Sequence, residues 1–179
     1  MSSARQSAIW EVQMQQVLLP KSGFAASECE DSIGADEQNG RFAVADGATE
    51  AFDARNWAQR LANNWVRDNI ALTPEAFAEW VAGEGRELHS CWKQLTLPWY
   101  AEEKARKGSF AAFVGIELDL RTDTPLWQAI ALGDACLLQC RNGALVRSLP
   151  LTNVTRSQPR GRGKGCPPMR PVIKSRKSS

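Results

Sequence analysis

Two acidic residues in this chain stand at the ends of short apolar runs, where carboxylates are unexpected. Asp46 ends the run "FAVAD" and is followed by Gly47, and Asp134 follows an apolar run and a glycine in "ALGDA". Glu30 and Asp31 form an acidic pair upstream. Carboxylates at the ends of buried strands are costly to desolvate unless a counter-charge offsets them. The pattern therefore predicts an acidic cleft that holds cations.

Hard divalent cations suit such a cleft, because Mg²⁺ and Mn²⁺ prefer oxygen ligands from carboxylates, backbone carbonyls and water. Asp46 is placed to bridge two ions, and Gly47 offers a carbonyl oxygen with no side chain in the way. Glu30 and Asp31 can supply a second ligand and orient a bound water. Two ions about 3.5–4 Å apart activate water and clamp a phosphoryl group. The expected chemistry is therefore metal-dependent hydrolysis.

The strands that must position these acids are predicted from hydrophobic periodicity. Strands are predicted at 8–19, 41–46, 109–120 and 126–134, and a loop is predicted over 20–40. Asp46 and Asp134 are the last residues of two of these strands. The dipeptide Asn142-Gly143 predicts the turn of a hairpin over 135–149.

Two helices are predicted between these groups of strands. Apolar residues at helical spacing in 50–68 indicate an amphipathic helix. Thr73 followed by Pro74 predicts the N-terminus of the second helix. Helices grouped between runs of strands favour an α+β layered fold over an alternating parallel one.

The charge is divided unevenly along the 179 residues. The segment 152–179 holds eight of the 22 basic residues and no acid, which leaves 14 basic against 20 acidic residues in 1–151. We predict one acidic domain over 1–151 and a basic, Pro/Gly-rich, disordered tail over 152–179. An acidic body argues against a nucleic-acid-binding domain, so nucleic acid is an expected partner only for the tail.

The five cysteines indicate free thiols in a reducing compartment, because they are odd in number and include no CxxC pair. Cys136 and Cys140 are predicted to be buried small hydrophobes. The N-terminus has no apolar signal region and no run is long enough to span a bilayer. We expect a cytoplasmic protein without a membrane partner.

Four blocks in order resemble the metal-dependent protein phosphatases of the PPM, or type 2C, family. They are "ED" at 30–31, "FAVADG" at 42–47, "GSFA" at 108–111 and "AIALGDACLL" at 129–138. The similarity covers roughly residues 8–151. It implies an antiparallel β-sandwich flanked by helices, a binuclear Mg²⁺ or Mn²⁺ centre, and hydrolysis of phosphoserine and phosphothreonine in a phosphorylated protein substrate.

The resemblance also implies roles for individual residues. Glu30 is similar to an acidic ligand of one metal, Asp46 to the bridging aspartate, and Gly47 to the glycine whose carbonyl binds the same ion. Asp31 is similar to the acid that holds a metal-bound water, so Asp31 and Asp46 are the implied catalytic residues. Asp134 is similar to the acid that contacts a further, weaker metal in some members.

Some positions depart from the family pattern. Ala26 stands where many members have a phosphate-binding arginine, and Ala48 where a histidine often acts as general acid. The later "DG" and "DN" blocks, whose aspartates complete the first metal's ligands, have no counterpart in 152–179. The sandwich is accordingly expected to be incomplete at its C-terminus, with half of the metal site and exposed sheet edges through which the chain oligomerises.

Other interpretations remain open at this stage. Each acid by itself is a common turn or loop residue. The alternative function is a non-catalytic phosphatase-like module that binds a partner protein, as a pseudophosphatase or a gene fragment would. A third alternative is a small nucleic-acid binder that uses its basic tail.

Overall fold

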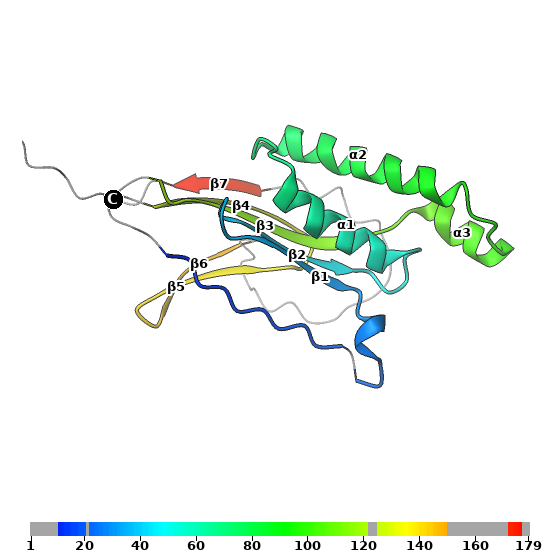
Figure 1. Ribbon diagram of the computed structural model, residues 1–179, viewed down its shortest axis with the longest axis horizontal. Helices are drawn as coiled ribbons and strands as arrows, with labels where there is room; N and C mark the ends of the chain where they lie inside the picture. Colours follow the sequence, from blue (N-terminus) through cyan, green and yellow to red (C-terminus); the bar gives the residue numbers. More distant parts are fainter. Residues whose placement is uncertain (1–10, 21, 122–124, 150–171, 177–179) are drawn as a thin grey trace, which may run out of the picture.

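A five-stranded antiparallel sheet forms the centre of the molecule. The computed structural model describes residues 11–20, 22–121, 125–149 and 172–176, the last of these as backbone. The strand order is β1-β2-β3-β4-β7, and the strands are β1 (Asp31–Asp36), β2 (Arg41–Gly47), β3 (Ala111–Asp119), β4 (Leu126–Leu132) and β7 (Val172–Arg176). Helices cover one face of this sheet, and a two-stranded hairpin lies across the other (Figure 1). The α+β class predicted from the sequence is therefore confirmed.

The helices follow one another between β2 and β3. They are α1 (Ala54–Arg67), α2 (Pro74–Trp92) and α3 (Trp99–Lys107), and a short 3₁₀ turn, η1 (Ala26–Glu28), precedes the sheet. The predicted start of α2 is confirmed, because the Thr73 hydroxyl accepts a hydrogen bond from the Ala76 N–H at 3.2 Å. Helix α3 was not predicted.

The main core lies between α1, α2 and the sheet. Trp65, Phe77 and Phe113 meet there, with the ring centroids of Trp65 and Phe113 5.4 Å apart and those of Phe77 and Phe113 5.6 Å apart. Two glycines let the sheet approach α1 closely. A Cβ at Gly115 would lie 2.5 Å from the Trp65 ring, and one at Gly34 would lie 2.2 Å from the Ala62 carbonyl oxygen.

Arg41 connects β2 with the C-terminal turn of α1. Its side chain is buried, its Nε donates to the Trp65 carbonyl at 3.0 Å, and its Nη1 lies 2.9 Å from the Glu117 carboxylate. Burial lowers the pKa of Arg41 from its ordinary value, and the nearby carboxylate of Glu117 opposes that shift. A cation at this position also complements the negative end of the helix dipole.

A smaller core lies on the opposite face of the sheet. The hairpin of β5 (Leu137–Arg141) and β6 (Ala144–Leu149) contributes Leu149, which packs with Val114, Ala129 and Ala131. The predicted turn of this hairpin is confirmed, because Asn142 and Gly143 both have positive φ, at 52° and 77°.

Three predictions about the ends of the fold need correction. Residues 11–19 of the predicted strand 8–19 form no strand, and the predicted loop 20–40 contains β1. Residues 172–176 of the predicted disordered tail form β7, which pairs with β4, whereas 152–171 and 177–179 lie outside the described residues. The predicted domain boundary at 151 lies outside them as well.

The described cysteines, 29, 91, 136 and 140, are free thiols. The prediction that Cys136 and Cys140 are buried is wrong, because both are exposed on the hairpin side of the sheet. Within the described part of the chain, no helix is both long enough and apolar enough to cross a bilayer.

Candidate metal centre

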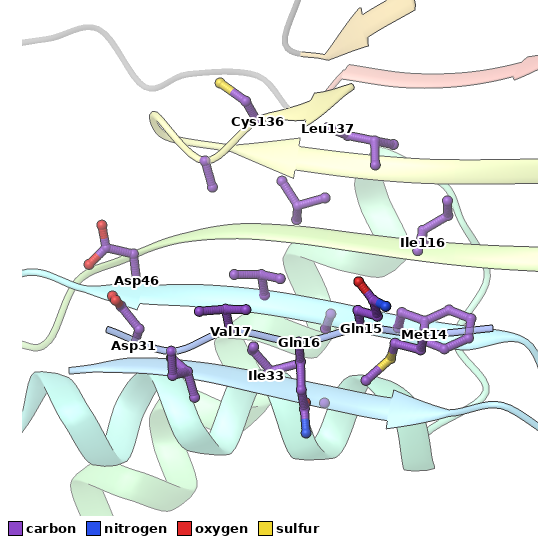
Figure 2. Close-up of a pocket in the computed structure, with 17 residues that line it drawn as sticks. Met14, Gln15, Gln16, Val17, Asp31, Ile33, Asp46, Ile116, Cys136 and Leu137 are labelled. Carbon is purple, nitrogen blue, oxygen red and sulfur yellow. The ribbon is translucent and has the colours of Figure 1, made fainter. Parts of the chain in front are cut away.

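Asp31 and Asp46 stand opposite each other at one end of the sheet. They are the first cross-strand pair of β1 and β2, and side chains at opposed positions project from the same face with Cβ atoms about 4.5–5.5 Å apart. Asp31 is half-buried and Asp46 is exposed. Figure 2 shows both carboxylates at the same end of a cavity. Two of the residues predicted to serve a metal site are thus brought together.

Glu30 is tied to the end of β2 by its backbone and by its side chain. Its carbonyl accepts the N–H of Gly47 at 3.2 Å, and its carboxylate accepts the hydroxyl of Thr49 at 2.6 Å. Glu30 does not line the cavity that Asp31 and Asp46 share. The third predicted acid is therefore adjacent to the pair along the chain, but its carboxylate is directed to Thr49.

Gly47 is buried where β2 meets the first turn of α1. A Cβ at this position would lie 2.6 Å from the Ala54 carbonyl oxygen and 3.0 Å from that of Glu30. Any other residue would therefore force β2 and α1 apart. Packing alone therefore explains why this position is occupied by glycine.

Asp134 lies two strands away from Asp46. It follows Gly133, whose φ is +78° and whose added Cβ would lie 2.9 Å from the Cβ of Ala112, and Ala112 is the cross-strand partner of Asp46. Neighbouring strands are about 4.8 Å apart, so β3 holds β2 and β4 about 10 Å from each other. Asp134 is exposed, at the same end of the sheet but apart from the Asp31–Asp46 pair.

The acids do not gather into a complete metal-binding group. Among residues 11–20, 22–121, 125–149 and 172–176, no three His, Cys, Asp or Glu side chains are placed to hold one ion together. Asp31 and Asp46 supply carboxylate oxygens, the type of ligand that Mg²⁺ and Mn²⁺ prefer. Two carboxylates are fewer ligands than these ions usually have. The described residues therefore fit part of such a centre.

The cavity beside this pair has a volume of about 570 Å³. Its walls are the hairpin-side face of β1–β3, the segment 14–18 and residues 135–137, where the chain enters β5. Apolar side chains dominate these walls: Met14, Val17, Leu18, Ile33, Phe42, Val44, Val114, Ile116 and Leu137.

Arg55 is a candidate site residue that the sequence patterns did not reveal. It lies in the first turn of α1, and its guanidinium donates to the carbonyl of Ser27 in η1. With Cys29 and Asp31 it lines a second, smaller cavity of about 310 Å³. The available signal was its place eight residues after the "DG" pair, at the start of the amphipathic pattern.

Comparison with protein-family models, with curated proteins and with solved structures finds no match for this chain. A functional assignment therefore depends on the residues and the geometry described above.

Proposed function

We propose that this chain carries a PPM-type phosphatase-like domain that hydrolyses phosphoserine and phosphothreonine in proteins with the help of Mg²⁺ or Mn²⁺. The observation that carries the proposal is the cross-strand pairing of Asp31 with Asp46. Next to this pair, the N–H of Gly47 donates a hydrogen bond to the carbonyl of Glu30. Two of the four acids that the resemblance selects thus meet at one end of the sheet.

The proposed metal ligands are Glu30, Asp46 and the carbonyl of Gly47, and Asp134 would serve a further, weaker ion. When bound, the ions would lower the pKa of a water ligand and neutralise charge on the phosphoryl group. With only part of the ligand set among the described residues, weak binding in the millimolar range is expected, as for sites with few carboxylate ligands.

The protein's own side chains have separate tasks in this proposal. The carboxylate of Asp31 would accept a hydrogen bond from the attacking water and hold it in place. Arg55 would bind the substrate phosphate through its guanidinium, replacing the arginine that the family often has at the position of Ala26. Its support is its place on the wall of the smaller cavity, together with Asp31.

The test is hydrolysis of a phosphothreonine peptide by the full chain, with and without Mn²⁺, alongside Asp46→Asn. We expect turnover that requires Mn²⁺ and is lost in Asp46→Asn. Glu37→Gln removes the same charge from the exposed turn between β1 and β2 and should leave turnover unchanged. Turnover that is equal in Asp46→Asn and in the unmodified chain would refute the proposal.

The absence of a three-ligand group among the described residues favours a second candidate, a non-catalytic phosphatase-like module that binds a phosphorylated partner. Such a module would bind the phosphothreonine peptide, lose that binding in Arg55→Ala, and release no phosphate at any Mn²⁺ concentration. Isothermal titration with the peptide, run beside the hydrolysis assay, separates the two candidates.

A further inference from the structure

The cavity beside Asp31 and Asp46 has the properties of a ligand site in its own right. We propose that it binds an amphipathic amine, with the apolar body of the ligand against β1–β3 and its ammonium group at the carboxylate of Asp31. This inference does not depend on the proposed phosphatase function. It rests on three features of the cavity: its apolar wall, the position of its charge, and its size.

The apolar wall is in contact with solvent at a place where a sheet is normally covered. Val44 lies in the middle of β2, between β1 and β3, yet 46% of its surface is exposed. Its neighbours on the same face, Ile33 and Val114, also line the cavity. Covering this wall with a hydrocarbon chain would remove apolar surface from water, which is favourable roughly in proportion to the area covered.

Negative charge is concentrated at one end of the cavity. The carboxylate of Asp31 lies there, opposite Asp46 on the neighbouring strand (Figure 2). The seventeen lining residues, all from the described part of the chain, include no lysine, arginine or histidine. A cationic group would be attracted to the carboxylate of Asp31, whereas an anionic ligand would be repelled by it.

The size of the cavity limits the ligand to a small molecule. A volume of about 570 Å³ falls within the range of small-molecule sites, which are mostly apolar with a few placed polar groups. One polar end and one long apolar wall fit a ligand with a single charged group on a hydrocarbon chain. The two ends of such a ligand make separate, testable contributions to affinity.

The experiment titrates the full chain with n-hexylamine, n-heptylamine and n-octylamine in the presence of EDTA, by isothermal titration calorimetry. Affinity should rise about three- to fourfold for each added methylene, as expected when the chain is buried in an apolar site. n-Octanoate, which has the same chain with the opposite charge, should bind at least about tenfold more weakly than n-octylamine. No saturable binding of any amine, or equal binding of octanoate and octylamine, would overturn the proposal.

Two variants assign the binding to the two ends of the cavity. Asp31→Asn should weaken n-octylamine binding about tenfold with little effect on n-octanol, because only the charged contact is lost. Val44→Thr should weaken both ligands about threefold. Glu37→Gln, with the same change of net charge outside the cavity, should bind like the unmodified chain. Equal loss in Glu37→Gln and Asp31→Asn would show general attraction to an acidic protein and refute the site.

A failed amine titration and a failed hydrolysis assay are distinguishable results. The titration contains no metal and no phosphate, so its outcome reports only on the cavity. Circular dichroism of each variant, compared with the unmodified chain, ensures that a lost signal reflects the substituted side chain and not unfolding.

Discussion

The indole ring of Trp65 lies directly against the α-carbon of Gly115, with no space between them for even one methyl group. A Cβ at Gly115 would lie 2.5 Å from Cε2 of the ring, well inside van der Waals contact. Trp65 is fully buried in α1, and Gly115 occupies the middle of β3. The contact sets how closely the helix layer can approach the sheet, and thereby where the N-terminus of α1 stands relative to Gly47.

Gly115→Ala should destabilise the fold by about 1–3 kcal/mol, the usual cost of forcing an extra carbon into a packed core. The ring of Trp65 would have to move against Phe77 and Phe113, whose rings pack edge-on with it. Urea unfolding followed by tryptophan fluorescence measures the change. An unchanged midpoint would mean that the helix layer can shift freely over the sheet.

Gly83→Ala is expected to change stability in the opposite direction. Gly83 lies inside α2, and a Cβ there would meet only the end of the Arg86 side chain, at 3.7 Å. Alanine is favoured over glycine within helices by about 1 kcal/mol, so the variant should be more stable by up to that amount. The same urea titration applies, and a loss of stability would contradict the open surroundings of this position.

Arg41→Lys should destabilise the chain by about 1–3 kcal/mol, although the charge is kept. A lysine has no planar fork, so it cannot contact both the Trp65 carbonyl and the Glu117 carboxylate as the guanidinium does. Arg121→Lys is the matched control, because the Arg121–Asp119 pair is on the surface. We expect the control to leave the thermal midpoint essentially unchanged. Equal shifts in the two variants would show that the buried contacts of Arg41 are unimportant.

Asp68 should make stability depend on pH in the acidic range. Burial raises the pKa of this carboxyl, but hydrogen bonds from Trp80 and Arg67 outweigh that effect and hold the pKa below its ordinary value. The carboxylate therefore stabilises the fold above the unfolded pKa of about 4, and this contribution is lost as the pH falls through the lower folded value. Asp68→Asn should be less stable than the unmodified chain at pH 7, and the difference should shrink below about pH 4. Glu79→Gln, on the exposed face of α2, gives the matched change of charge.

The β5–β6 hairpin should cause the chain to associate. Leu138, Leu145 and Val146 are each more than half exposed on its strands. Exposed apolar side chains on a short two-stranded sheet favour contact with a second copy. The double variant Leu138→Thr/Leu145→Thr should lower the apparent mass in size-exclusion chromatography with light scattering. A monomer at every concentration of the unmodified chain would contradict both this expectation and the sequence-based prediction of oligomers.

Some elements could be predicted because their signals are local. The cap at Thr73 and the turn at Asn142-Gly143 are set by residues within four positions of each other, and both are confirmed. β1 was missed because its sequence, "DSIGAD", has the composition of a loop, and its strand form depends on pairing with β2 and on Gly34 fitting under α1. The segment 11–20 has an alternating pattern but pairs with no strand in the described structure. Alternation indicates which side chains would share one face of a strand, but it does not provide the second strand needed for pairing.

The candidate site was only partly predictable for a related reason. Asp46 was identified correctly as a strand-end residue, whereas Asp31 was placed in a loop and in fact begins β1. The pairing of Asp31 with Asp46 depends on the register of a hairpin that the sequence did not reveal. Asp134 was expected to share their cleft, and instead β3 stands between β2 and β4. Strand order is a long-range property, because it is decided by the packing of the whole sheet and not by residues near each acid.

The neighbouring position of β2 and β3 has a consequence for how the chain folds. β2 ends at Gly47 and β3 begins at Ala111, and all three helices lie between them. The β1–β2 hairpin can form within microseconds, whereas closing so long a loop must wait for a slower conformational search. We expect the docking of β3 under α1 to limit the folding rate. Gly115→Ala should then slow refolding, whereas substitutions in the β5–β6 hairpin should mainly accelerate unfolding.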